Sequence, residues 1–293
     1  MSKLSSNPIT QSDIKKYLSS YSDFSFELQV LKKFADMGFM CSHGGTYEDP
    51  VTGKSREYDI RALLQTDFIR VHLSVECKNL RENFPLVVHC LERKDNESYN
   101  ELIHTFQPKT PTQQVGPISL PVPSAFIETS QSIRIRQFSL YPEKQFVAKS
   151  ADQVGKRHDN GEITSTDGEV FDKISQAINS SLDLITEAHY LDTDVFPTYY
   201  TLVCPVLVIP DSSLWQVKYS DDGGQIGEPE QINHVSYYIG KEWTVGDKLN
   251  SLSYTISHLE IITYSEIQNF VEKYLGKRIT FYSEIISSRR KFW

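Results

Sequence analysis

The stretch "IRVHLSVECK", from Ile69 to Lys78, decides the fold because its apolar and polar residues alternate as they do in a β-strand. Side chains alternate between the two faces of a strand, so the apolar positions are predicted to face a core. The opposite face then carries Glu76 and Lys78, about 6–7 Å apart along the strand. A glutamate and a lysine on a strand that otherwise suits a core require an explanation.

The preceding stretch "YEDPVTGKSREYDIRALL", residues 47–64, predicts a hairpin that leads into a second strand. Asp49 and Pro50 open a turn, and Gly53 can take the left-handed conformation that closes it. The strand that follows carries Asp59 between Tyr58 and Ile60, although aspartate is unfavourable in strands. This second strand therefore raises the same question as the first.

Pairing of the two strands brings Asp59 close to Glu76 on the polar side of the sheet. Two carboxylates at that distance repel each other unless a cation lies between them. Ligation by oxygen alone favours Mg²⁺ or Mn²⁺ over zinc. A third acid, Glu27, falls on the apolar stripe of a helix predicted over residues 22–37 and needs a partner there. A salt bridge to a lysine or arginine, or extension toward solvent, accounts for Glu27 equally well.

This combination of a helical glutamate, a strand aspartate after a hairpin, and the tripeptide "ECK" resembles the PD-(D/E)xK, or restriction-endonuclease-like, nuclease superfamily. The resemblance spans roughly residues 22–92. It implies that Asp59 and Glu76 are metal ligands and that the backbone carbonyl of Cys77 is a further ligand. It also implies that Lys78 orients or activates the attacking water, and that Glu27 is tied to the metal through water.

The combined pattern is more specific than the Glu-x-Lys tripeptide, which also occurs by chance. A second copy, Glu92-Arg93-Lys94, ends a strand that runs into a charged loop and has the character of a solvated strand end. The copy at residues 76–78 is preferred because it ends a cleanly alternating strand. That strand directly follows the Asp59 strand and is expected to pair with it. One departure from the family pattern is Tyr58, which stands where the motif has proline.

The resemblance implies a metal-dependent endonuclease that hydrolyses phosphodiester bonds, with Mg²⁺ or Mn²⁺ as cofactor and DNA as the expected substrate. A cation held by Asp59 and Glu76 would supply a nucleophilic water and compensate the leaving oxygen. Lys78 either transfers a proton or binds phosphate, and the sequence does not choose between these roles. One alternative is a non-catalytic nucleic-acid or protein-binding module on the same scaffold. Another is an enzyme of a different class.

The order of predicted elements is a helix, a hairpin with strands, an irregular segment, a helix over residues 170–191, further strands, and a last helix ending at Gly276. A strand over residues 84–91 follows the strand over residues 69–78, and these early strands are expected to be neighbours in sequence order. This order predicts an α/β fold with a mixed β-sheet flanked by helices, as a single domain over residues 1–293. Residues 95–167, with prolines clustered between positions 108 and 123, are expected to be an insertion. It either packs across the core or moves as a flap, and is the best candidate for shaping substrate access.

Composition limits the remaining classes. The chain has 293 residues and a net charge of −8, which argues against coating nucleic acid through uniform basicity but not against a metal-dependent enzyme. The four cysteines form no CxxC pair, so neither a zinc site nor a disulfide framework is expected. A cytoplasmic location is expected instead. No apolar run approaches the length needed to cross a membrane, and no signal peptide is evident.

Several basic or polar residues are secondary candidates for contact with a nucleic-acid backbone. Solvated surface positions explain most of them equally well, and a homodimer would be the simplest way to cut both strands of a duplex. The candidates are Lys54, Arg56, Gln153, Lys156, residues 276–278 and residues 288–292.

Overall fold

The computed structural model describes residues 7–20, 22–66, 68–106, 112–115, 117–121, 129–157, 160–166, 168–190, 198–246 and 250–290. Its helices are α1 (Gln11–Ser20), α2 (Phe24–Asp36), α3 (Gly168–His189), α4 (Ile267–Asn269) and α5 (Gly276–Arg290), with a 3₁₀ turn η1 (Asp95–Glu97) and a π-helical segment η3 (Phe270–Leu275). The first strands are β1 (Met40–His43), β2 (Thr46–Glu48), β3 (Ser55–Glu57), β4 (Ile60–Gln65), β5 (Ile69–Cys77), β6 (Leu86–Glu92), β7 (Asn100–Phe106), β8 (Thr112–Val115) and β9 (Ile118–Pro121). The later strands are β10 (Ser130–Ile135), β11 (Phe146–Lys156), β12 (Ile163–Thr166), β13 (Thr198–Ile209), β14 (Leu214–Tyr219), β15 (Gln225–Gln231), β16 (His234–Gly246) and β17 (Ser251–Thr263).

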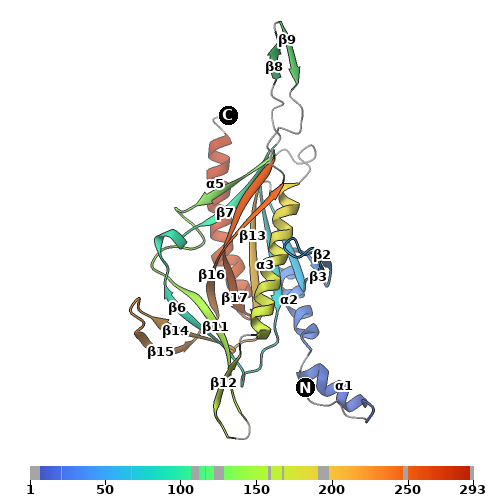
Figure 1. The fold of residues 1–293 in the computed structure, drawn as a ribbon, viewed down its shortest axis with the longest axis vertical. Helices are drawn as coiled ribbons and strands as arrows, with labels where there is room; N and C mark the ends of the chain where they lie inside the picture. Colours follow the sequence, from blue (N-terminus) through green and yellow to red (C-terminus); the bar gives the residue numbers. More distant parts are fainter. Residues whose placement is uncertain are drawn as a thin grey trace.

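One large mixed sheet organises the molecule, as the sequence predicted (Figure 1). Its main path runs β1-β4-β5-β13-β17-β16-β11-β6-β14-β15, with β7, β10 and β12 joined at its sides. β4 pairs antiparallel with β5, whereas β13 runs parallel to both β5 and β17. The pairing of the two strands that carry Asp59 and Glu76 in the sequence argument is therefore confirmed.

Helices cover both faces of this sheet. The residues of β5 that were predicted to face a core pack with α2, η3 and α5 on one face. The opposite face packs against α3, which lies along β13 and β5 (Figure 1). The polar side of β5 is thus covered by a helix, and Ser74 and Glu76 on that side are fully buried. The flanked mixed sheet of the α/β class is confirmed.

The hairpin before Asp59 forms as predicted, although it stands apart from the large sheet. β2 and β3 pair only with each other, and the turn between them is closed by a hydrogen bond from the Gly53 N–H to the Asp49 carbonyl, at 2.7 Å. Gly53 has φ of 64°, the left-handed conformation that glycine tolerates. Asp59 lies in the bend between β3 and β4, one residue before the strand in which it was expected.

Two other sequence expectations are corrected. β6 does not lie beside β5, because β13 takes that place and β6 pairs with β11 and β14. The last helix does not end at Gly276, since this residue is helical and opens α5.

Residues 95–167, expected to be an insertion, contribute β7, β10, β11 and β12 to the large sheet. The strands β8 and β9, which lie within the stretch of clustered prolines, pair with each other and stand away from the sheet, at the end opposite β12 (Figure 1).

Candidate active site

Asp59 and Glu76 face each other across β4 and β5. Ile60 is paired with Val75 in the antiparallel register, which places the preceding Asp59 beside Glu76. The Asp59 Oδ2 accepts a 2.8 Å hydrogen bond from the Cys77 backbone N–H. In return, the Asp59 backbone N–H lies 3.4 Å from the Glu76 Oε1. These reciprocal contacts fix both carboxylates on the same side of the sheet.

A lysine from α3 bridges the two carboxylates. The Lys173 Nζ donates to the Asp59 Oδ2 at 2.7 Å and to the Glu76 Oε2 at 2.9 Å. Since both oxygens contact one nitrogen, they can be separated by no more than the sum of these two distances. The Glu76 side chain is 1% exposed, while those of Asp59 and Lys173 are 14% and 18% exposed. Two carboxylates therefore converge on a single cationic position, which is nearly sealed from solvent.

The electrostatics of this ion cluster reflect its burial. Burial, followed by the negative charge of Asp59, raises the pKa of the Glu76 carboxyl, and Lys173 opposes part of that rise. The pKa of Lys173 is also raised: burial lowers it, but the charges of Glu76 and Asp59 outweigh that effect. The ammonium is therefore held in its charged form by the two acids. The carboxylates in turn depend on a cation to remain ionised in this environment.

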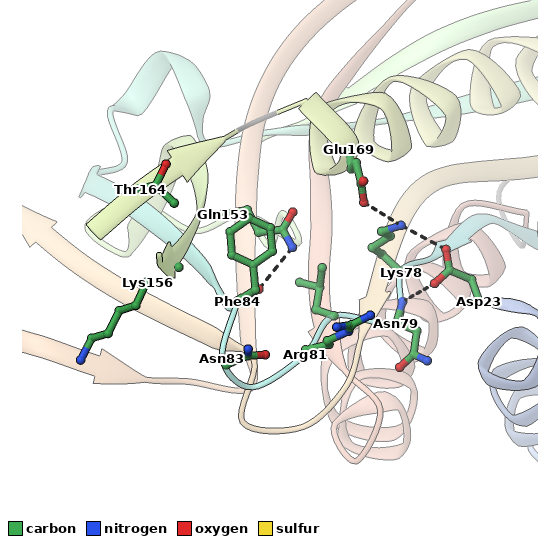
Figure 2. Close-up of a pocket in the computed structure, with 12 residues that line it drawn as sticks. Asp23, Lys78, Asn79, Arg81, Asn83, Phe84, Gln153, Lys156, Thr164 and Glu169 are labelled. Atoms are coloured by element: carbon green, nitrogen blue, oxygen red, sulfur yellow. Dashed lines mark hydrogen bonds and ion pairs between the residues drawn. The ribbon is translucent and has the colours of Figure 1, made fainter. Parts of the chain in front are cut away.

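Lys78 does not join this cluster. Its Nζ lies 3.3 Å from the Asp23 Oδ2 and 3.1 Å from the Glu169 Oε2 (Figure 2). Asp23 immediately precedes α2, but its side chain makes no capping hydrogen bond and instead accepts from Lys78 and from the Asn79 N–H. Lys78 is thus paired with Asp23 and Glu169 just beyond the end of β5.

Glu27, in the first turn of α2, lies near the cluster of Asp59, Glu76 and Lys173. Its partner is neither a lysine nor an arginine, because its Oε2 pairs with the His43 Nε2 at 3.0 Å. Burial and the nearby charge of Asp59 raise the pKa of Glu27. This influence of Asp59 shows that Glu27 lies within electrostatic range of the cluster. The histidine, at the end of β1, is a residue that the sequence argument did not include.

The donor set fits a hard divalent cation better than zinc. Across the described ranges, no group of three or more His, Cys, Asp or Glu side chains is arranged to hold a metal ion. Two carboxylates are nevertheless the usual protein contribution to a Mg²⁺ site, where water and substrate phosphate supply the other ligands. Asp59 and Glu76 match that donor set, provided that the Lys173 ammonium leaves the position between them.

A groove of about 480 Å³ opens beside Lys78, next to the ion cluster. It is lined by segments far apart in the sequence, and among its residues are two of the secondary candidates, Gln153 and Lys156 (Figure 2). Glu169 also lines the groove, and it precedes Lys173 by one turn of α3. The Glu169 and Lys173 backbones are therefore about 6 Å apart along the helix axis, so the wall of the groove and the ion cluster share adjacent turns of α3.

Other residues that the sequence singled out either make contacts within the protein, are simply exposed, or lie outside the part of the chain that the structure describes. Arg56 lies 3.4 Å from the Asp49 carboxylate in the hairpin, and Lys54 is exposed beside it. In the second Glu-x-Lys tripeptide, Glu92 and Lys94 are exposed, whereas Arg93 is buried and donates to the Pro142 carbonyl. The side chains of residues 288–290 and all of residues 291–293 lie outside the described part of the chain.

Lys173 is the principal site residue that sequence reasoning missed. It lies on the same helical face as Val170, Ile174 and Ala177, which are buried against the sheet. A lysine on the apolar stripe of a helix is the same kind of signal that singled out Glu27 on α2. Applied to α3, this criterion would have identified Lys173.

Comparison of the chain with protein-family models, curated proteins and solved structures finds no match. The case for a function therefore rests on the geometry of the site. Among the described residues, no helix combines the length and apolar character needed to cross a bilayer.

Proposed function

We propose that this chain is a metal-dependent nuclease of the PD-(D/E)xK, restriction-endonuclease-like type, which hydrolyses phosphodiester bonds in DNA. The observation that carries this proposal is the convergence of Asp59 and Glu76, from paired antiparallel strands, on a single cationic nitrogen. A buried and a partly buried carboxylate held this close favour a cation between them, because a positive charge relieves their repulsion. The position is next to a groove that contains cationic residues.

Asp59 and Glu76 would hold Mg²⁺ or Mn²⁺, with the Cys77 carbonyl as a further ligand by resemblance. Such an ion activates water and stabilises charge on the leaving oxygen. The protein fixes the Asp59 carboxylate for this purpose through the Cys77 N–H, at 2.8 Å. Glu27, paired with His43, adds negative charge at the margin of the site.

In this proposal, Lys173 supplies the lysine function of the site. It already contacts both metal-binding carboxylates, and their charges keep it protonated. When it yields its position to the metal ion, it remains a cation beside the reacting phosphate and can neutralise developing charge. Lys78, held by Asp23 and Glu169, instead belongs to the wall of the adjacent groove.

The second candidate is a binding module without catalysis, which the Lys173 bridge favours. An ammonium between the two carboxylates already satisfies them, so this ion cluster is complete without a metal ion. The nuclease is the better-supported proposal because a purely structural site does not require two acids to be buried side by side. A homodimer and a cytoplasmic location accompany the nuclease proposal as predictions from the sequence.

A cleavage assay with an isosteric variant tests the proposal. Wild-type protein and Asp59→Asn are incubated with plasmid DNA, single-stranded DNA and RNA, each with Mg²⁺, Mn²⁺ or EDTA. We expect cleavage by the wild type with Mg²⁺ or Mn²⁺, no cleavage in EDTA, and loss of activity in Asp59→Asn.

The matched control is Glu92→Gln, which changes an exposed acid in the second Glu-x-Lys tripeptide. It is expected to cleave like the wild type. Cleavage that persists in Asp59→Asn or in EDTA would overturn the metal site. Binding without cleavage of any polymer, unchanged in Asp59→Asn, would favour the binding module.

A further inference from the structure

The groove beside the ion cluster contains a buried polar atom with an unmet hydrogen bond. Gln153, on β11, is 4% exposed and lines the groove. Its Nε2 donates to the Phe84 carbonyl at 3.2 Å, whereas its Oε1 has no hydrogen-bond partner among the described residues. Leaving a buried acceptor without a donor is unfavourable, so a ligand that supplies a donor here would be stabilised.

The orientation of the Gln153 amide is set by the backbone. Only the amide nitrogen can donate to the Phe84 carbonyl, and the oxygen is therefore forced to the other side. Figure 2 shows this oxygen directed away from Phe84, toward the side where Lys78 and Glu169 lie. The groove wall thus contains a buried acceptor without a donor, which a ligand N–H or O–H could satisfy by entering the wall beside it.

Phe84 provides an aromatic surface beside this acceptor. Its ring packs on Gly155, where a Cβ atom would come within 2.6 Å of the ring. A glycine at this position therefore lets one edge of the ring approach the β11 backbone closely. The ring is only partly buried and lines the groove. An aromatic ring supported on one face is a platform on which a nucleobase can stack.

The charged groups of the groove favour an anion. Its acids, Asp23 and Glu169, are both paired with Lys78. The other charged lining residues, Arg81 and Lys156, are exposed cations. With the two acids neutralised in part by one lysine, the groove has a net positive lining on a protein whose net charge is −8. Phosphate is the anion that such a lining attracts from a polynucleotide.

We propose that this groove binds an unpaired nucleotide of the substrate strand, with its base on Phe84, a donor group on the Gln153 oxygen and its phosphate near Lys156. The inference rests on the proposed nuclease function and specifies its substrate as a strand with unpaired bases. A base inside a duplex is covered on both faces, so only an unstacked base can use the ring. The one-turn spacing from Glu169 to Lys173 sets this nucleotide beside the cleavage site.

Binding in the absence of divalent metal ions tests this inference separately from cleavage. Fluorescence anisotropy is measured in EDTA with labelled single-stranded DNA, RNA of the same sequence and a blunt DNA duplex. We expect Phe84→Leu to weaken binding of the unpaired strands about 5- to 150-fold, the range of one lost base–aromatic stack, and to leave duplex binding unchanged. The DNA and RNA arms show which polymer supplies the nucleotide.

Two further variants separate binding from stability. Lys156→Ala changes an exposed residue and is expected to lower the slope of log affinity against log salt by about one, as loss of one phosphate contact does. Phe138→Leu changes an exposed phenylalanine on another surface and is the matched control, expected to bind like the wild type. Thermal unfolding of Phe84→Leu establishes that the variant is folded.

The outcomes distinguish the two proposals. Wild-type affinity in Phe84→Leu together with an unchanged salt slope in Lys156→Ala would overturn the groove, even if Asp59-dependent cleavage is observed. An equal loss of duplex binding in Phe84→Leu would also overturn it, because stacking would then not be the cause. Weakened binding of unpaired strands without cleavage of any polymer would support the groove and refute the nuclease.

Discussion

Two buried glutamates on the same sheet are stabilised in different ways. Glu76 on β5 and Glu260 on β17 are both fully buried, and β13 lies between their strands. Glu260 lies on the face covered by the C-terminal helical segment, where its Oε2 contacts the His234 Nε2 at 2.6 Å and the Ser236 hydroxyl at 3.1 Å. Glu76 lies on the α3 face, beside a second acid and an ammonium.

The difference separates a structural acid from a candidate cation site. His234 and Ser236 both contact the Glu260 Oε2, its Oε1 has no hydrogen-bond partner among the described residues, and no second carboxylate contributes to its contacts among the described side chains. Glu76 faces Asp59, whose charge adds to burial in raising the pKa of Glu76, and the Lys173 ammonium opposes that rise. A buried acid by itself therefore indicates little about function. A pair of buried acids around one cation indicates a place where a metal ion can bind.

Matched substitutions of the two glutamates test this comparison with the largest expected effect. Glu76→Gln keeps the shape of the side chain but removes a ligand charge, so we expect metal-dependent cleavage to fall at least about 100-fold. Glu260→Gln makes the same chemical change on the other face and is expected to keep full cleavage activity while lowering thermal stability. Cleavage rates and unfolding temperatures of both variants are the measurements.

Equal loss of cleavage in the two variants, with both proteins folded, would break the comparison. Loss in Glu260→Gln alone would move the candidate site to the opposite face of the sheet. Either result would show that the contacts of a buried acid do not distinguish its role in this protein.

Local sequence patterns predicted the part of the site that is set by β-strand geometry. Alternation in residues 69–77 placed the core face correctly, and turn chemistry at Asp49 and Gly53 placed the hairpin. The proximity of Asp59 and Glu76 followed from pairing of consecutive strands, which is the commonest arrangement. These features depend on short-range constraints that a sequence displays directly.

The contacts of the two lysines depend on long-range packing and were not accessible in the same way. Lys78 follows Glu76 by two residues, which suggested a shared face, but the strand ends at Cys77 and the alternation no longer applies. Lys173 is distant in sequence and reaches the acids only because α3 packs across β5. The predicted position of β6 beside β5 was wrong for a related reason, because β13, a strand from much later in the chain, pairs with β5 instead.

Substitutions of Lys173 and Lys78 provide the second test, in which the free energy of unfolding is compared. Lys173→Met leaves Asp59 and Glu76 buried without a cation, and removing one partner of a buried ion cluster costs about 3–5 kcal/mol of unfolding free energy. Added Mg²⁺ or Mn²⁺ is expected to restore part of that loss, because the metal ion then replaces the ammonium. Urea denaturation with and without metal ions measures both effects.

Lys78→Met is the matched control for this test. Its partner Glu169 is 71% exposed and its other partner Asp23 is 18% exposed, so the expected loss is smaller than for Lys173→Met and does not respond to metal ions. A Lys173→Met protein that is destabilised but gains nothing from metal ions would identify the cluster as structural. It would thereby remove the distinction drawn between Glu76 and Glu260.

His72 lies on the same face of β5 as Glu76 and, unlike Glu76 and Glu260, is accommodated there by staying uncharged. Its titration gives the smallest of the effects predicted here. Burial, followed by the charges of Arg70 and Arg61, lowers the pKa of His72 from 6.5 to about 4, so this side chain is neutral where Glu76 is paired. The unfolded chain binds a proton at His72 below about pH 6.5 but the folded chain does not, so stability is lost as pH falls through the window from 6.5 to 4. We expect this loss to approach about 3 kcal/mol and to be absent in His72→Gln, measured as the difference between the two urea-denaturation series across that window. Parallel pH profiles of the two proteins would mean that His72 accepts its proton in the folded state, and that the α3 face tolerates charge without the pairing that Glu76 receives.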